Sequence, residues 1–258
     1  MHERINFLFL NIGHFFDHLF MLLFATVAAL TLSRQWGMGY AELIPYATPG
    51  FIAFGVCALP AGWIADKWSR KGMMIIFFIG IGASSIATSL AQTPLQISAG
   101  LTAIGVFAAI YHPVGLALVV QGRDKTGMAL AINGVFGNIG VAGAALIAGY
   151  LIDASGWQWV FVLPGMLSIA TGILYAGFIF STRRSGAALA GAGAKPPEKA
   201  PIDRQVLIRV FAVIFISTGI GGLVFQSTTF SLPKIFDERL GDLAGSATMI
   251  GWYAFVVF

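Results

Sequence analysis

Eight long runs of apolar residues follow one another along the chain, separated by short polar segments. They cover residues 5–32, 43–65, 73–92, 95–120, 126–152, 157–181, 210–232 and 247 onward. A helix of about 20 apolar residues crosses the ~30 Å hydrocarbon core of a bilayer, and it bonds all its own backbone polar groups there. The pattern therefore predicts an all-α fold, a polytopic membrane helical bundle. Buried helices of a soluble protein do not explain the number and length of these runs.

Composition agrees with this prediction. The 258 residues are 57% apolar and 10% charged, with a mean hydropathy of +0.84, far from the values of soluble domains. The first run is too long for a cleaved secretory signal and carries Asp17 in its middle. Cys57 is the single cysteine, so no disulfide can form within the chain.

The basic residues predict an orientation. If the N-terminus is cytoplasmic, 12 of the 15 Lys and Arg fall on the inner side and only Arg34, Lys234 and Arg239 on the outer side. This bias follows the positive-inside rule for short loops. The basicity of the chain thus reflects multi-pass topology in a cell (inner or plasma) membrane, and we expect no nucleic-acid partner.

The runs form a group of six, a linker and a further two. Residues 183–204 are rich in small residues and proline, as in a flexible cytoplasmic connection. We therefore expect a six-helix transmembrane domain at 1–182, a linker at 183–204, and the start of a second transmembrane domain at 205–258. Because the last residues stop inside an apolar run, the sequence predicts a fragment or a truncated gene product.

A specific motif lies between the second and third runs, where Gly62, Asp66, Lys67, Arg70 and Lys71 occur in the order Gly-x-x-x-Asp-Lys-x-Ser-Arg-Lys. Glycine allows close backbone approach at a helix end, and the carboxylate can face a helix N-terminus and pair with a nearby cation. A simple stop-transfer cluster would explain only the basic residues. The motif resembles the signature loop of the major facilitator superfamily, where it implies a conformational latch.

The first run carries a polar stripe. Asn11, His14, Asp17 and His18 fall within about a third of the circumference of a helix, which we expect to face the bundle interior. At ~1.5 Å rise per residue, His14 and His18 lie roughly 13 Å and 20 Å deep. Secondary transporters place their sites near this depth.

The fourth run contributes Tyr111, His112 and Pro113. His112 lies at about the same depth as His14, counted at ~1.5 Å per residue. Pro113 removes a backbone donor, so we expect a kink beside the histidine. A structural histidine bonded across the bundle is the alternative interpretation of His112.

The fifth run places Asn133, Gly137, Gly140 and Ala144 on one helical face. Such a narrow stripe of small residues allows another helix to come close. Asn133 and Asn138 are further candidates to line a cavity.

Three chemistries fit histidines beside a carboxylate. A metal site would suit His14 and His18, but no metalloprotease-type motif is present and the same spacing serves any inward-facing pair. No serine or threonine stands out as a nucleophile, so we expect no enzyme. Proton coupling remains, because histidine titrates near physiological pH and a carboxylate in low dielectric can exchange charge with it. We expect no metal and no cofactor.

Two short segments, Gly13–Asp17 in the first run and Ala108–Pro113 in the fourth, resemble the corresponding segments of the fosmidomycin-resistance branch of the major facilitator superfamily. The resemblance implies two six-helix halves, a central cavity and proton-driven export of small molecules. The chain departs from many drug/proton antiporters in lacking an arginine in the fourth run and in having Ala144 where their glycine-rich motif has proline.

We therefore expect a proton-coupled secondary transporter that exports a small molecule across the lipid bilayer by alternating access. The residues expected to bind substrate or protons are Asn11, His14, Asp17, His18, Tyr111, His112, Asn133 and Asn138. The alternatives are a symporter or facilitator for an organic acid or sugar, or a non-transporting sensor or partner-binding protein on the same fold.

Overall fold

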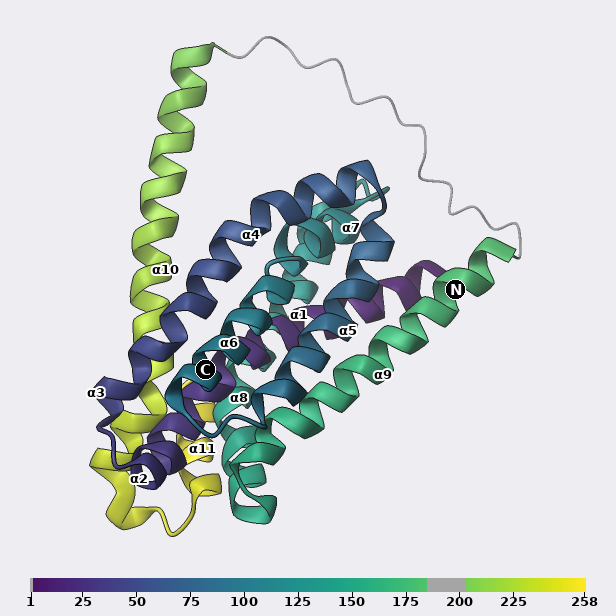
Figure 1. Ribbon diagram of the computed structural model, residues 1–258. Helices are drawn as coiled ribbons and strands as arrows, with labels where there is room; N and C mark the ends of the chain where they lie inside the picture. Colours follow the sequence, from purple (N-terminus) through teal and green to yellow (C-terminus); the bar gives the residue numbers. More distant parts are fainter. Residues whose placement is uncertain (1, 185–202) are drawn as a thin grey trace.

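The computed structural model describes residues 2–184 and 203–258, which form helices joined by short turns (Figure 1). No strand occurs among these residues, and seven helical segments are long and apolar enough to cross a membrane. The expected all-α membrane bundle is confirmed. The segments are His2–Trp36, Tyr40–Lys67, Arg70–Thr88, Pro94–Val120, Thr126–Ser155, Trp157–Thr182 and Arg204–Leu243.

Several segments contain more than one helical element. The first comprises α1 (His2–Val27), η1 (Ala28–Leu32) and α2 (Ser33–Trp36), and the second α3 (Tyr40–Leu43), η2 (Ile44–Ala47) and α4 (Thr48–Lys67). Single helices α5 (Arg70–Thr88), α8 (Thr126–Ser155) and α9 (Trp157–Arg184) form the third, fifth and sixth. The predicted linker falls mostly on residues 185–202, which lie outside the described part of the chain.

The fourth segment is interrupted at the position that proline predicts. It comprises α6 (Pro94–Ala108), the π-helix η3 (Tyr111–Gly115) and α7 (Leu116–Val120). Pro113 lies inside η3, where the missing N–H group and the bulky ring widen the helical turn. The α-helix is thus interrupted beside His112, at the position where a kink was expected.

Glycines on α8 allow this helix to pack closely against α1. A Cβ atom added to Gly140 on α8 would lie 2.4 Å from the backbone oxygen of Phe15 on α1. One added to Gly137 would lie 2.8 Å from the His14 ring. Because only glycine leaves this space, α1 and α8 pack with their backbones unusually close.

The seventh segment is longer than the sequence suggested. The apolar run ends at Leu232, but α10 (Arg204–Leu240) continues through Pro233 and is followed by η4 (Gly241–Leu243). Lys234 lies 3.3 Å from Asp237 and 3.5 Å from Glu238, at helical spacings of three and four residues. Pairs at this spacing favour helix, which explains the extension. The eighth run forms α11 (Ala247–Phe255).

The segment after the linker contacts the six-helix bundle near the end of the bundle that carries Arg34. The hydroxyl of Tyr40 donates to the carbonyl of Phe230 over 2.8 Å, and Arg34 lies 3.7 Å from Asp237. By contrast, residues 204–225 of α10 are exposed, and Figure 1 shows this part of α10 standing away from the bundle.

Candidate functional site

His14 is held in the bundle interior by two other elements. Its Nδ1 atom lies 2.8 Å from the backbone oxygen of Asn133 on α8, and its ring stacks on Tyr111 of η3 with 4.9 Å between centroids. A carbonyl oxygen can only accept, so Nδ1 carries the hydrogen. In the neutral ring the Nε2 atom therefore carries no hydrogen and can accept a hydrogen bond.

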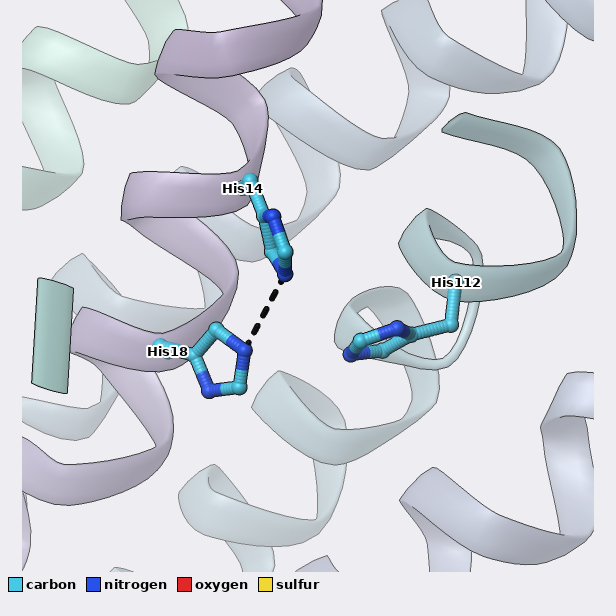
Figure 2. A group of neighbouring side chains, drawn as sticks. All are labelled: His14, His18 and His112. Carbon is cyan, nitrogen blue, oxygen red and sulfur yellow. Dashed lines mark hydrogen bonds between the residues drawn. The ribbon is translucent and has the colours of Figure 1, made fainter. Parts of the chain in front are cut away.

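His18 lies one helical turn further along α1. Its Nε2 atom is 3.2 Å from Nε2 of His14, and Figure 2 shows the two rings directed toward each other, with His112 approaching from another element. Because Nε2 of neutral His14 accepts, Nε2 of His18 donates. Ring nitrogens of all three histidines lie within 4.8 Å of one another.

Asp17 links α1 to η3. Its Oδ2 atom lies 3.2 Å from Nε2 of His112, and its side chain is 1% exposed whereas that of His112 is 38% exposed. The Oδ1 atom of Asp17 is buried and has no hydrogen-bond partner. Of the acidic residues that the structure describes, only Asp17 is buried. A buried carboxylate with one unsatisfied oxygen is costly unless a cation or donor compensates it.

A second polar network lies beside the histidines. The Tyr111 hydroxyl donates to the backbone oxygen of Leu10 over 2.8 Å and accepts from Nδ2 of Asn133 over 2.9 Å. The same Asn133 amide donates to Oδ1 of Asn11 over 2.9 Å. These mutually satisfied groups join α1, η3 and α8, and they hold the histidine cluster in place.

Seven of the eight predicted site residues thus come together in the interior. Asn138 does not, because it is exposed on α8 and makes none of these contacts. The residue lies five positions after Asn133 and therefore on a different face of the helix.

The predicted latch lies at the turn between α4 and α5. Asp66 pairs with Arg70 through Oδ1, at 2.8 Å from Nη2 and 3.0 Å from Nε. The N-terminus of α5 is capped by Ser69, whose Oγ accepts from the backbone N–H of Gly72. Asp66 therefore pairs with a cation, Arg70, as expected, whereas Ser69 caps the N-terminus of α5.

The other signature residues lie around this pair. A Cβ atom on Gly62 would be 3.2 Å from Cβ of Pro113, so the glycine lets α4 approach η3. Lys67 is the last residue of α4 and is exposed, and Lys71 belongs to the first turn of α5.

One polar contact was not predicted from the sequence. Asp153 near the end of α8 accepts hydrogen bonds from the backbone N–H groups of Ala247 and Thr248 and from the Thr248 hydroxyl. It thereby caps the start of α11 from a different helix. No local pattern signals this contact, because the two partners lie more than 90 residues apart.

Comparisons with known proteins agree with this architecture. The chain is 28% identical over 228 residues to the 4-hydroxybenzoate transporter PcaK of Pseudomonas putida, covering 78% of the chain and 50% of that protein. It is 26% identical over 244 residues to a probable actinorhodin transporter of Streptomyces coelicolor, covering 88% of the chain and 38% of that protein. The chain thus spans at most about half the length of these relatives.

The fold also matches solved transporters. A POT family transporter in complex with 5-aminolevulinic acid superposes with a TM-score of 0.57 at 16% identity, over 88% of this chain and 47% of that one. At this identity the likeness concerns the fold alone. The profile of the Major Facilitator Superfamily matches residues 10–258. This chain, a multi-pass helical membrane protein, therefore belongs to the Major Facilitator Superfamily.

Proposed function

We propose that the chain is the N-terminal half and the start of the second half of a proton-coupled secondary transporter that exports small organic molecules by alternating access. The observation that best supports this proposal is the contact between the buried carboxylate of Asp17 on α1 and His112 on η3. Secondary transporters place substrate and coupling ions at such interior polar sites. We also propose that the chain belongs to the fosmidomycin-resistance branch of the superfamily.

Asp17 and His112 are proposed to exchange the coupling proton. The titratable groups around them are His14 and His18 on α1 and Tyr111 on η3, while α8 contributes the uncharged Asn133. Histidine changes charge in the physiological pH range, and an ion pair in low dielectric is sensitive to whether water can reach it. Alternate exposure of this pair to the two sides would therefore couple proton movement to the change of conformation.

The orientation proposed places the N-terminus and the Asp66–Arg70 pair in the cytoplasm. The contacts of Tyr40 with Phe230 and of Arg34 with Asp237 then lie at the external end. An arrangement joined at the external end, with residues 203–225 free of the bundle at the other end, fits a conformation closed to the outside.

Relatives support two solute classes. Similar proteins include a puromycin resistance protein of Streptomyces alboniger, 27% identical over 63% of this chain, and the 4-hydroxybenzoate transporter already described. Export of a small organic molecule is our proposal. Uptake of an aromatic acid is the second candidate, and PcaK is the relative that favours it.

Transport assays test the proposal. The longest natural gene product that carries these 258 residues is reconstituted in proteoliposomes, and efflux and uptake of puromycin and 4-hydroxybenzoate are measured with and without a pH gradient. Asp17→Asn should abolish gradient-driven flux but retain solute exchange at equilibrium, because exchange needs no net proton movement. Asp124→Asn, in an exposed turn, is the control. Full gradient-driven flux in Asp17→Asn would contradict proton coupling through this residue.

A further inference from the structure

The three histidines of the interior cluster lie close enough together to become ligands of one metal ion, and two of them already have the required spacing. Two nitrogens bound to one tetrahedral zinc ion at 2.0–2.1 Å lie about 3.3 Å apart, and the Nε2 atoms of His14 and His18 are 3.2 Å apart. Oδ2 of Asp17 lies 3.2 Å from Nε2 of His112. We propose that His14, His18 and His112 bind one divalent transition-metal ion, with His18 in the tautomer that leaves its Nε2 atom unprotonated, and that the Asp17 carboxylate compensates the charge of the ion.

His14 is already oriented as a ligand. Histidines that bind metals donate their second ring N–H to a carbonyl or carboxylate, which fixes the tautomer and directs the other nitrogen to the ion. The backbone oxygen of Asn133 accepts from Nδ1 of His14 at 2.8 Å, and Nε2 points to His18. The stack of the ring on Tyr111 further restricts its rotation.

The carboxylate supplies the negative charge that the site needs. Asp17 is 1% exposed, and its Oδ1 atom has no hydrogen-bond partner although it is buried. A divalent cation would compensate this charge directly. This unsatisfied oxygen is an observation independent of the histidines, and it points to a positively charged occupant.

His112 is the adjustable member of the set. Its ring nitrogen is within 4.8 Å of the other two ligand nitrogens, so a side-chain rotation that shortens the longest distance by about 1.5 Å brings the three nitrogens to the spacing found around a tetrahedral ion. At 38% exposure it is also the member most open to an entering ion. Figure 2 shows it facing the His14–His18 pair from η3.

The ligand set selects the class of metal. Imidazole nitrogens suit Zn²⁺, Co²⁺, Ni²⁺ and Cu²⁺, whereas Mg²⁺ and Ca²⁺ prefer oxygen ligands. Bound metal would join α1 to η3 and would compete with protons for the same atoms. The inference concerns the same residues as the proposed function but needs no transport, so the two can fail separately.

Spectroscopic titration with Co²⁺ tests the site. The purified 258-residue protein in detergent is titrated with Co²⁺, and the visible d–d absorption of four-coordinate cobalt is followed, with Zn²⁺ added afterwards as competitor. We expect saturation at one ion per chain and loss of the absorption with Zn²⁺. His18→Ala and His112→Asn should each weaken Co²⁺ binding by ~100-fold or more, since even outer-shell changes cost 10–100-fold.

His2→Ala provides the matched control, because His2 is the one histidine outside the cluster. This variant should bind Co²⁺ like the wild type. Absence of saturable absorption in the wild type would overturn the proposal, as would equal binding by His112→Asn. If His18→Ala fails to fold, as judged by size-exclusion chromatography, His112→Asn decides the outcome, since the His112 side chain is partly exposed.

Discussion

The Nδ1–H group of His14 donates to the backbone oxygen of Asn133, 119 positions later in the chain, over 2.8 Å. This bond fixes the tautomer of a histidine in the bundle interior and joins α1 to α8. Because the acceptor is a main-chain atom, the side chain of Asn133 remains available for Asn11 and Tyr111. One residue of α8 thus supports both the histidine cluster and the neighbouring polar network.

Tyr111→Phe should destabilise the protein. The change removes the hydroxyl that donates to the Leu10 carbonyl and accepts from Asn133, and loss of a buried hydrogen bond costs about 0.5–1.5 kcal/mol. Thermal unfolding in detergent measures the effect as a lower Tm. Tyr150→Phe is the control, because Tyr150 is 60% exposed. Equal Tm values for the two variants would show that the network adds no stability.

Gly140→Ala should separate α1 from α8. The new methyl group would lie 2.4 Å from the backbone oxygen of Phe15, and overpacking of this kind costs about 1–3 kcal/mol. Gly134→Ala on the same helix is the matched control, since no atom lies within 4 Å of its added Cβ. We expect a lower Tm and poorer monodispersity for Gly140→Ala only. Tolerance of both substitutions would argue against the close α1–α8 packing.

Asp153→Ala should loosen the start of α11. The variant loses the acceptor for the backbone N–H groups of Ala247 and Thr248, and loss of a helix cap costs about 0.5–2 kcal/mol. Hydrogen–deuterium exchange should become faster in the first turn of α11 and remain unchanged in α5. Asp124→Ala, in an exposed turn, serves as control. Unchanged exchange at Thr248 would contradict the capping role.

Cysteine labelling tests the proposed orientation. In a Cys57→Ser background, single cysteines replacing Gln35 or Gln92 should react with a membrane-impermeant thiol reagent in intact cells. A cysteine replacing Asp124 should react only after the membrane is permeabilised. All three positions are exposed, so sidedness alone decides the result. The reverse pattern would place the N-terminus and most of the basic residues outside the cell, against the positive-inside rule.

The sequence was sufficient to predict the membrane-spanning helices, the break at Pro113 and the gathering of most site residues. These predictions rest on local properties, because a helix in lipid must satisfy its own backbone and a polar stripe such as that of Asn11, His14 and Asp17 has only the bundle interior to face. Asn138 is exposed on another face of α8 than Asn133, and its expected place at a cavity stays a prediction.

The sequence by itself determined what each helix could do, and the tertiary structure decided which groups meet. The contact of Asp17 with His112, the bond of His14 to a backbone oxygen of α8 and the cap of α11 by Asp153 all join residues more than 90 positions apart. Such contacts depend on how closely whole helices pack: the sequence shows the stripe of small residues on one helix, and only the tertiary structure shows which helix packs against it.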